Sequence, residues 1–266
     1  IGGESTLTRR LAEIYEAQLG DIERATTCYE RVLSFDPENV ETLGALERLH
    51  ARREDWEGLL AVYRKKADLV WDVEEKRSVY HATCRLLREE LGRPEESIEV
   101  YESILMLDER DQEALSELQG LHEQYERWDD LVALLRRQLP QSSVGEERAK
   151  VHLRLGQIFH SHLGATDRAI DEWVAVLSEG ADVEDAVAAL ERLLSERTIP
   201  GWEGVAARVC DVLHPRFRDT GEWKREVAVL TVRGQLASSD RDKAAFLRMA
   251  GERLETRGNA FEAAFD

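Results

Sequence analysis

The sequence predicts an all-α protein built from antiparallel helix hairpins that repeat along the chain. Helix-favouring Leu, Ala, Glu and Arg are frequent, whereas 17 Gly and 5 Pro among 266 residues are too few turn formers for an all-β chain. Apolar residues recur at three-and-four spacing in successive segments, which is typical of amphipathic helices. One Leu-Gly pair also recurs at a constant interval, as Leu19-Gly20, Leu91-Gly92 and Leu163-Gly164. The constant interval indicates an internal repeat of about 72 residues.

This repeat offset aligns three copies and keeps aromatic and aliphatic classes in register; positions that it aligns are called a column below. The aligned sets are Tyr29, Tyr101 and Trp173; Leu33, Leu105 and Leu177; Leu46, Leu118 and Leu190; and Leu49, Leu121 and Leu193. Register maintained over three copies indicates a tandem array, and we expect a single solenoid over residues 1–266. Its expected repeat units cover residues 5–76, 77–148, 149–222 and, truncated, 223–266.

Each unit is expected to contain four helices. In the first unit, helices over residues 7–15 and 22–33 are separated by Gly20, which can adopt the positive φ that closes a helix. Asp36-Pro37 predicts a cap followed by a proline at the first position of a third helix. That helix carries the apolar residues of 40–49. A turn over residues 53–55 then leads to a fourth helix that starts at Trp56.

The register breaks after the third unit. Trp202 lies two residues beyond the position that the repeat predicts from Trp128. We expect one inserted helix near residues 201–214, ended by His214-Pro215, after which the pattern resumes at Trp223. The last hairpin is cut short and the first residue is Ile1 rather than Met, so we expect the chain to be a segment of a longer protein.

The first unit resembles a tetratricopeptide repeat, with one extra residue before the glycine. The matching residues are Leu11, Ala12, Tyr15, Gly20, Asp21, Ala25, Tyr29, Val32, Asp36 and Pro37. The second hairpin is a degenerate copy in which Glu54 replaces the glycine. The resemblance implies a right-handed superhelix whose first helices line a concave groove for a peptide or helix. It implies a scaffold for protein–protein interaction, with no catalysis and no cofactor.

Transferring the groove-facing columns of that family to this chain gives candidate partner-binding residues. They are Arg48, Arg52, His81, Arg85 and Arg88. We interpret them as a basic strip that receives an acidic segment or a terminal carboxylate, because guanidinium groups pair bidentately with carboxylates. The alternative is that these arginines pair with glutamates of their own chain. The Lys/Asn/Lys/Arg clamp of the family is missing, so chaperone tails are not a favoured ligand.

The charge and the reactive residues exclude several function classes. A formal net charge of −18 disfavours nucleic acid and anionic membranes, and no apolar run is long enough to span a bilayer. His160 and His162 point about 200° apart on a helix and cannot share a metal, so no metal site is expected. Three scattered cysteines predict neither a disulfide framework nor a nucleophile, which favours a reducing, cytoplasmic compartment.

Two rival readings remain open. An α/α toroid could close helix hairpins around an active site, although no motif in the sequence proposes one. A repeat segment could also self-associate by stacking its ends head to tail.

Overall fold

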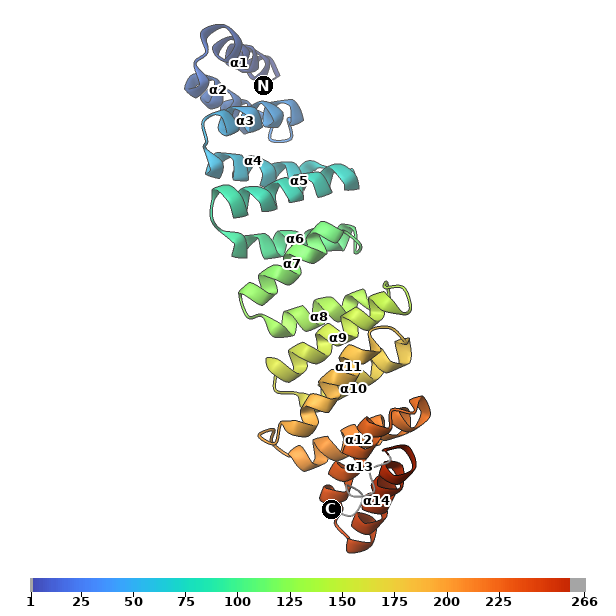
Figure 1. Ribbon diagram of the computed structural model, residues 1–266. Helices are drawn as coiled ribbons and strands as arrows, with labels where there is room; N and C mark the ends of the chain where they lie inside the picture. The colour runs from blue at the N-terminus through green and yellow to red at the C-terminus, as the bar shows by residue number, and fades with distance from the viewer. Residues whose placement is uncertain (1, 259–266) are drawn as a thin grey trace. The chain divides into compact units, whose positions relative to one another are not determined.

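The computed structural model describes residues 2–258 and divides the chain into two compact units, Ile1–Arg127 and Trp128–Asp266. Within the described residues every regular element is a helix (Figure 1). The all-α class and the solenoid of repeated helices are therefore confirmed. No described helix combines the length and the apolar character needed to cross a membrane.

Unit 1 is a stack of α-helices in which each helix packs against the next one along the chain. The helices are α1 (Gly2–Ile14), α2 (Ile22–Phe35), α3 (Val40–Arg52), α4 (Trp56–Leu69), α5 (Val73–Arg85), α6 (Ser97–Leu107) and α7 (Gln112–Gln124). Short turns extend two first helices and precede α6: the π-helical η1 (Tyr15–Leu19) and η2 (Leu86–Glu90), and the 3-10 turn η3 (Pro94–Glu96).

Unit 2 has the same construction. Its elements are α8 (Trp128–Gln138), α9 (Glu146–Ser161), α10 (Thr166–Glu179), α11 (Val183–Ser195), α12 (Trp202–Thr220), α13 (Trp223–Leu236), α14 (Asp240–Arg253) and the π-helical η4 (Leu254–Gly258). A continuous core around Phe159, Trp173, Leu190 and Phe217 joins α8 to α13. Since each repeat contacts its neighbours, this core extends along the stack instead of around one centre.

The turns follow the predicted pattern with one error. Gly20 has φ +65° at the end of η1, and Gly92 and Gly164 have φ +63° and +61° at the equivalent positions. The expectation that Asp36-Pro37 starts the third helix is wrong. Asn39 is the cap instead, because its amide oxygen accepts a hydrogen bond from the Thr42 N–H at 3.0 Å.

A separate helix, α12, lies between α11 and α13 and packs against both. The expected end at His214-Pro215 is wrong, because α12 continues through Pro215 to Thr220. Proline removes one backbone hydrogen bond inside the helix. Shortly after it, Phe217 is fully buried in the core of unit 2, and this burial offsets the lost bond. The boundaries of the repeat units stay a prediction.

Candidate partner-binding surface

In unit 1 a charged residue at the end of a first helix contacts the aromatic residue of the helix that follows. The Tyr29 hydroxyl donates a hydrogen bond to the Glu16 carboxylate at 3.1 Å. In the same columns of the next copy, Arg88 donates to the Tyr101 hydroxyl at 3.2 Å. Glu16 lies in η1 and Arg88 in η2, so a π-helical turn at the end of a first helix carries the charged residue in both copies. The repeat thus preserves the position of the contact and reverses the sign of its charge.

A third helix supplies the opposite charge in each case. Arg48 of α3 lies 3.5 Å from the Glu16 carboxylate, and Glu117 of α7 lies 2.5 Å from the Arg88 guanidinium. These pairs join α1 to α3 and α5 to α7, which are the first helices of successive hairpins. Each of these charged contacts therefore spans two first helices of unit 1.

Unit 2 repeats the arrangement with an imidazole. His160 of α9 meets the Trp173 ring edge-on, with ring centroids 5.9 Å apart, and its Nε2 lies 3.0 Å from the Glu196 carboxylate. The nearby His162 stacks on Trp128 with ring centroids 3.6 Å apart. The two histidines of the His-x-His sequence thus have different partners. Among the described residues, no group of three or more His, Cys, Asp or Glu side chains could hold a metal ion.

Burial controls the protonation of the contact residues. It raises the pKa of Tyr29 to about 12, and the hydrogen bond to Glu16 adds to the increase. Burial also raises the pKa of Tyr101 to about 12, although the bond from Arg88 acts in the opposite direction. The pKa of the Cys84 thiol rises to about 12 for the same reason. Both phenols and this thiol are neutral at pH 7, so they act as packing and hydrogen-bonding groups.

Three of the five predicted binding residues have carboxylate neighbours within unit 1. Arg48 and Arg88 form the pairs described above. The His81 Nε2 lies 2.9 Å from Asp111, and its Nδ1 lies 3.6 Å from Glu113. The surface is therefore mixed in charge at these positions.

The other two predicted residues, Arg52 and Arg85, have exposed side chains. Within residues 2–258 neither has an ion-pair partner. Arg52 ends α3 and Arg85 ends α5, so both lie at the C-terminal end of a first helix. The structure thus separates the five candidates into paired and unpaired groups.

Two hollows lie along the first helices. A hollow of about 250 Å³ between α1 and α3 includes Arg9, Glu16, Tyr29 and Arg48 in its lining. A second one, of about 530 Å³, lies between α5 and the start of α7 and includes His81. Each hollow is lined by at least one residue of these charged pairs. The paired side chains therefore lie at concave parts of the surface.

Comparison with known proteins identifies the repeat. Family models described as tetratricopeptide repeat match residues 10–39, from the end of α1 through α2, and residues 42–77, from α3 through α4 into the start of α5. This chain is a tetratricopeptide repeat protein. Tetratricopeptide repeat proteins are scaffolds for protein interaction, typically without enzymatic activity, so this chain has protein partners. No curated protein sequence matches it.

Several solved structures of tetratricopeptide repeat proteins are similar at low identity. YrrB, described as having an unusual peptide-binding site, shares 14% identity over 68% of this chain and 89% of its own, with a TM-score of 0.34. A tetratricopeptide repeat protein from Parabacteroides merdae shares 13% identity over 99% and 100%, also with 0.34. The C-terminal part of a repeat protein from Cytophaga hutchinsonii shares 12% over 97% and 98%, with 0.37.

In this tetratricopeptide repeat protein, sequence reasoning found the cations of the surface and missed their acidic partners. Neither Glu16 nor Glu117 was among the predicted binding residues. The available signal was the repeat offset itself, since Glu16 and Arg88 occupy the same column with opposite charge. A column that changes sign between copies indicates that its partner changes sign too.

Proposed function

We propose that this tetratricopeptide repeat protein is a non-catalytic scaffold that binds an acidic segment of a protein partner along the first helices of unit 1. The observation that carries the proposal is the state of Arg52 and Arg85. Both guanidinium groups are exposed and have no ion-pair partner among the described residues. A guanidinium in this state can bind a carboxylate bidentately without breaking an internal pair.

The paired residues have a different part in this proposal. Arg88 would have to give up Glu117 and Tyr101 before binding a ligand, and Arg48 would have to give up Glu16. Their pairs hold the first helices together and keep the surface in shape. We therefore assign direct contact with the acidic segment to Arg52 and Arg85. The net charge of −18 opposes the approach of such a segment, so slow association is expected.

Charge reversal of both contact residues tests the proposal. The double variant Arg52→Glu/Arg85→Glu is expected to bind a fluorescein-labelled poly-glutamate peptide about tenfold more weakly, because it loses charge-assisted contacts and adds repulsion. Fluorescence anisotropy titration gives the affinity.

The matched control is Arg241→Glu/Arg248→Glu in α14. These arginines are also exposed and without an ion-pair partner among residues 2–258, and the control changes the net charge equally. Equal weakening of peptide binding in both variants would show that the effect comes from net charge alone. Absence of binding to the unaltered protein would contradict the proposal directly.

A further inference from the structure

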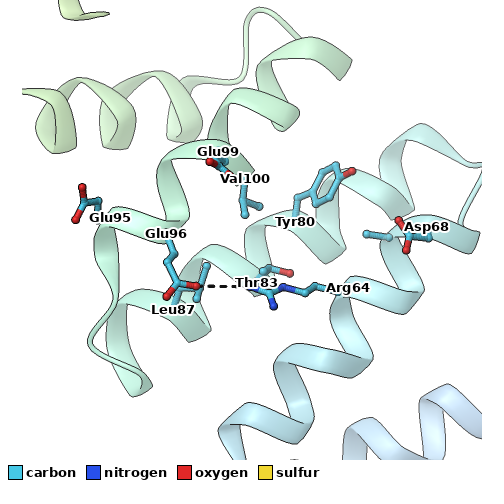
Figure 2. Close-up of a pocket in the computed structure, with 10 residues that line it drawn as sticks. Arg64, Asp68, Tyr80, Thr83, Leu87, Glu95, Glu96, Glu99 and Val100 are labelled. Atoms are coloured by element: carbon cyan, nitrogen blue, oxygen red, sulfur yellow. Dashed lines mark ion pairs between the residues drawn. The ribbon is translucent and has the colours of Figure 1, made fainter. Parts of the chain in front are cut away.

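A pocket of about 590 Å³ lies between α4, α5 and the start of α6, all within unit 1 (Figure 2). Its lining includes none of the five predicted binding residues. Its charged lining residues are Arg64, Asp68, Glu95, Glu96 and Glu99, and Val100 lies beside them. The pocket thus involves the second helices of two hairpins, α4 and α6, and is separate from the surface proposed above.

The lining combines apolar side chains with excess negative charge. The lining holds four carboxylates and one guanidinium, that of Arg64, which lies 3.6 Å from Glu96 (Figure 2). Glu95 and Glu99 are exposed, stand one helical turn apart and have no ion-pair partner among residues 2–258. Val100 is half-buried and contributes an apolar surface. The pocket therefore offers two unpaired carboxylates beside an apolar surface.

The next copy of the repeat shows how cations occupy the equivalent place. Phe159 stands in the column of Leu87, and two guanidinium groups lie over its ring. They belong to Arg136 and Arg168, at 5.4 Å and 5.8 Å from the ring centroid. Arg136 is the counterpart of Arg64, but the counterpart of Arg168 in unit 1 is a glutamate. Unit 1 thus lacks one of the two cations that cover this site in unit 2.

The two carboxylates also have counterparts that bind a cation. Asp167 and Asp171 of α10 occupy the columns of Glu95 and Glu99. Both are bound by Arg208 of α12, whose Nη1 lies 3.2 Å from Asp167 while its Nη2 contacts Asp171. In unit 2, the two carboxylates in these columns therefore bind a guanidinium from a neighbouring helix.

We infer that the pocket of unit 1 binds an arginine side chain that a helical segment of a partner protein presents. The guanidinium bridges Glu95 and Glu99, and an apolar neighbour of that arginine packs on the exposed part of Val100. Two carboxylates one turn apart fit the two edges of a guanidinium. The net charge of −18 steers such a basic segment toward the chain and repels the acidic segment proposed for the first helices. The two ligands are therefore distinguishable by charge.

The test uses the whole chain and a fluorescein-labelled helical peptide that carries one arginine between leucines. The variant Glu95→Gln/Glu99→Gln is expected to bind this peptide about fivefold more weakly at physiological ionic strength, because two exposed ion pairs are lost. A peptide with citrulline in place of arginine, which keeps the shape and removes the charge, is expected not to bind. Glu96→Arg, which introduces the cation found in unit 2, is expected to weaken binding as well.

The control variant Glu30→Gln/Glu38→Gln removes two exposed carboxylates of unit 1 that have no ion-pair partner among the described residues. It is expected to bind the arginine peptide as tightly as the unaltered protein. Equal losses in the two glutamine variants would show attraction by net charge alone and would overturn the inference. Binding of the citrulline peptide, or displacement of the arginine peptide by spermine at equal concentration, would overturn it too. Poly-glutamate binding should be unchanged in Glu95→Gln/Glu99→Gln.

Discussion

At the scale of single residues, the first-helix side chain that faces the aromatic residue is smaller in the copy where the aromatic residue is larger. Cys84 faces Tyr101 in unit 1, and the same columns of unit 2 hold Gly156 and Trp173. A Cβ atom built on Gly156 would lie 2.3 Å from the Trp173 Nε1, which is closer than atoms can approach. The glycine is therefore required by the indole.

A methyl group added at Gly156 is predicted to lower the stability of the fold. Gly156→Ala is expected to lower the free energy of unfolding by about 1–3 kcal/mol, because the buried indole has no space to move into. Gly120→Ala in α7, where nothing lies within 4 Å of the added carbon, is expected to raise it by up to about 1 kcal/mol through helix propensity. Urea titration followed by circular dichroism measures both. Changes of the same sign would contradict the packing account.

Residue spacing also explains which part of the candidate surface was predictable. The column of Glu16 and Arg88 follows from the repeat offset, so the positions could be read from the sequence. The partners could not, because Arg48 and Glu117 follow them at different separations along the chain and do not share a column. Which neighbour a long side chain selects depends on its rotamer and on the helix that packs beside it.

At the scale of helices, the turns with glycine were predictable, whereas the length of α12 was not. Gly20 and Gly92 end their segments because their positive φ is a local requirement. Pro215 is a local signal as well, but the packing of Phe217 outweighs it. A long-range contact of this kind leaves no mark in the adjacent sequence, so the helix was predicted too short.

One face of α1 is exposed, although its counterparts are buried. Leu7 and Leu11 expose 72% and 44% of their surface, whereas Val79 in the column of Leu7 exposes 6% and Leu155 in the column of Leu11 exposes 0%. In those copies α4 packs on α5 and α8 packs on α9. Among residues 2–258 no helix packs on α1 in the way that α4 packs on α5, and the two leucines are exposed.

The two leucines of one column give the second prediction on stability. Leu155→Ala is expected to lower the free energy of unfolding by about 2–5 kcal/mol, because it leaves a cavity in the core of unit 2. Leu11→Ala is expected to change it by less than about 1 kcal/mol, since much of the side chain is already in water. The two variants remove the same atoms from the same repeat column. Comparable losses in urea titration would show that the α1 face is covered in solution.

At the scale of the whole chain, stability is expected to be local to each unit. Residues in a repeat array contact their sequence neighbours, so a complete stack can fold without the remainder. A fragment of residues 1–127 is expected to give a helical circular dichroism spectrum and cooperative urea unfolding. A control fragment that ends at Val100, inside α6, is expected to lose cooperativity because α5 loses part of its packing partner. An unfolded 1–127 fragment would contradict the autonomy of unit 1.

The order of the helices in unit 2 has a consequence for a bound ligand. Short loops join antiparallel helices, so each helix in a stack reverses the direction of the one before. Three helices separate α12 from α8, as three separate α8 from α4, and all three of these helices begin at a tryptophan, Trp56, Trp128 and Trp202. The helices α9, α11 and α13 therefore run in the same direction, and a ligand that lies along α9 and α11 can continue onto α13.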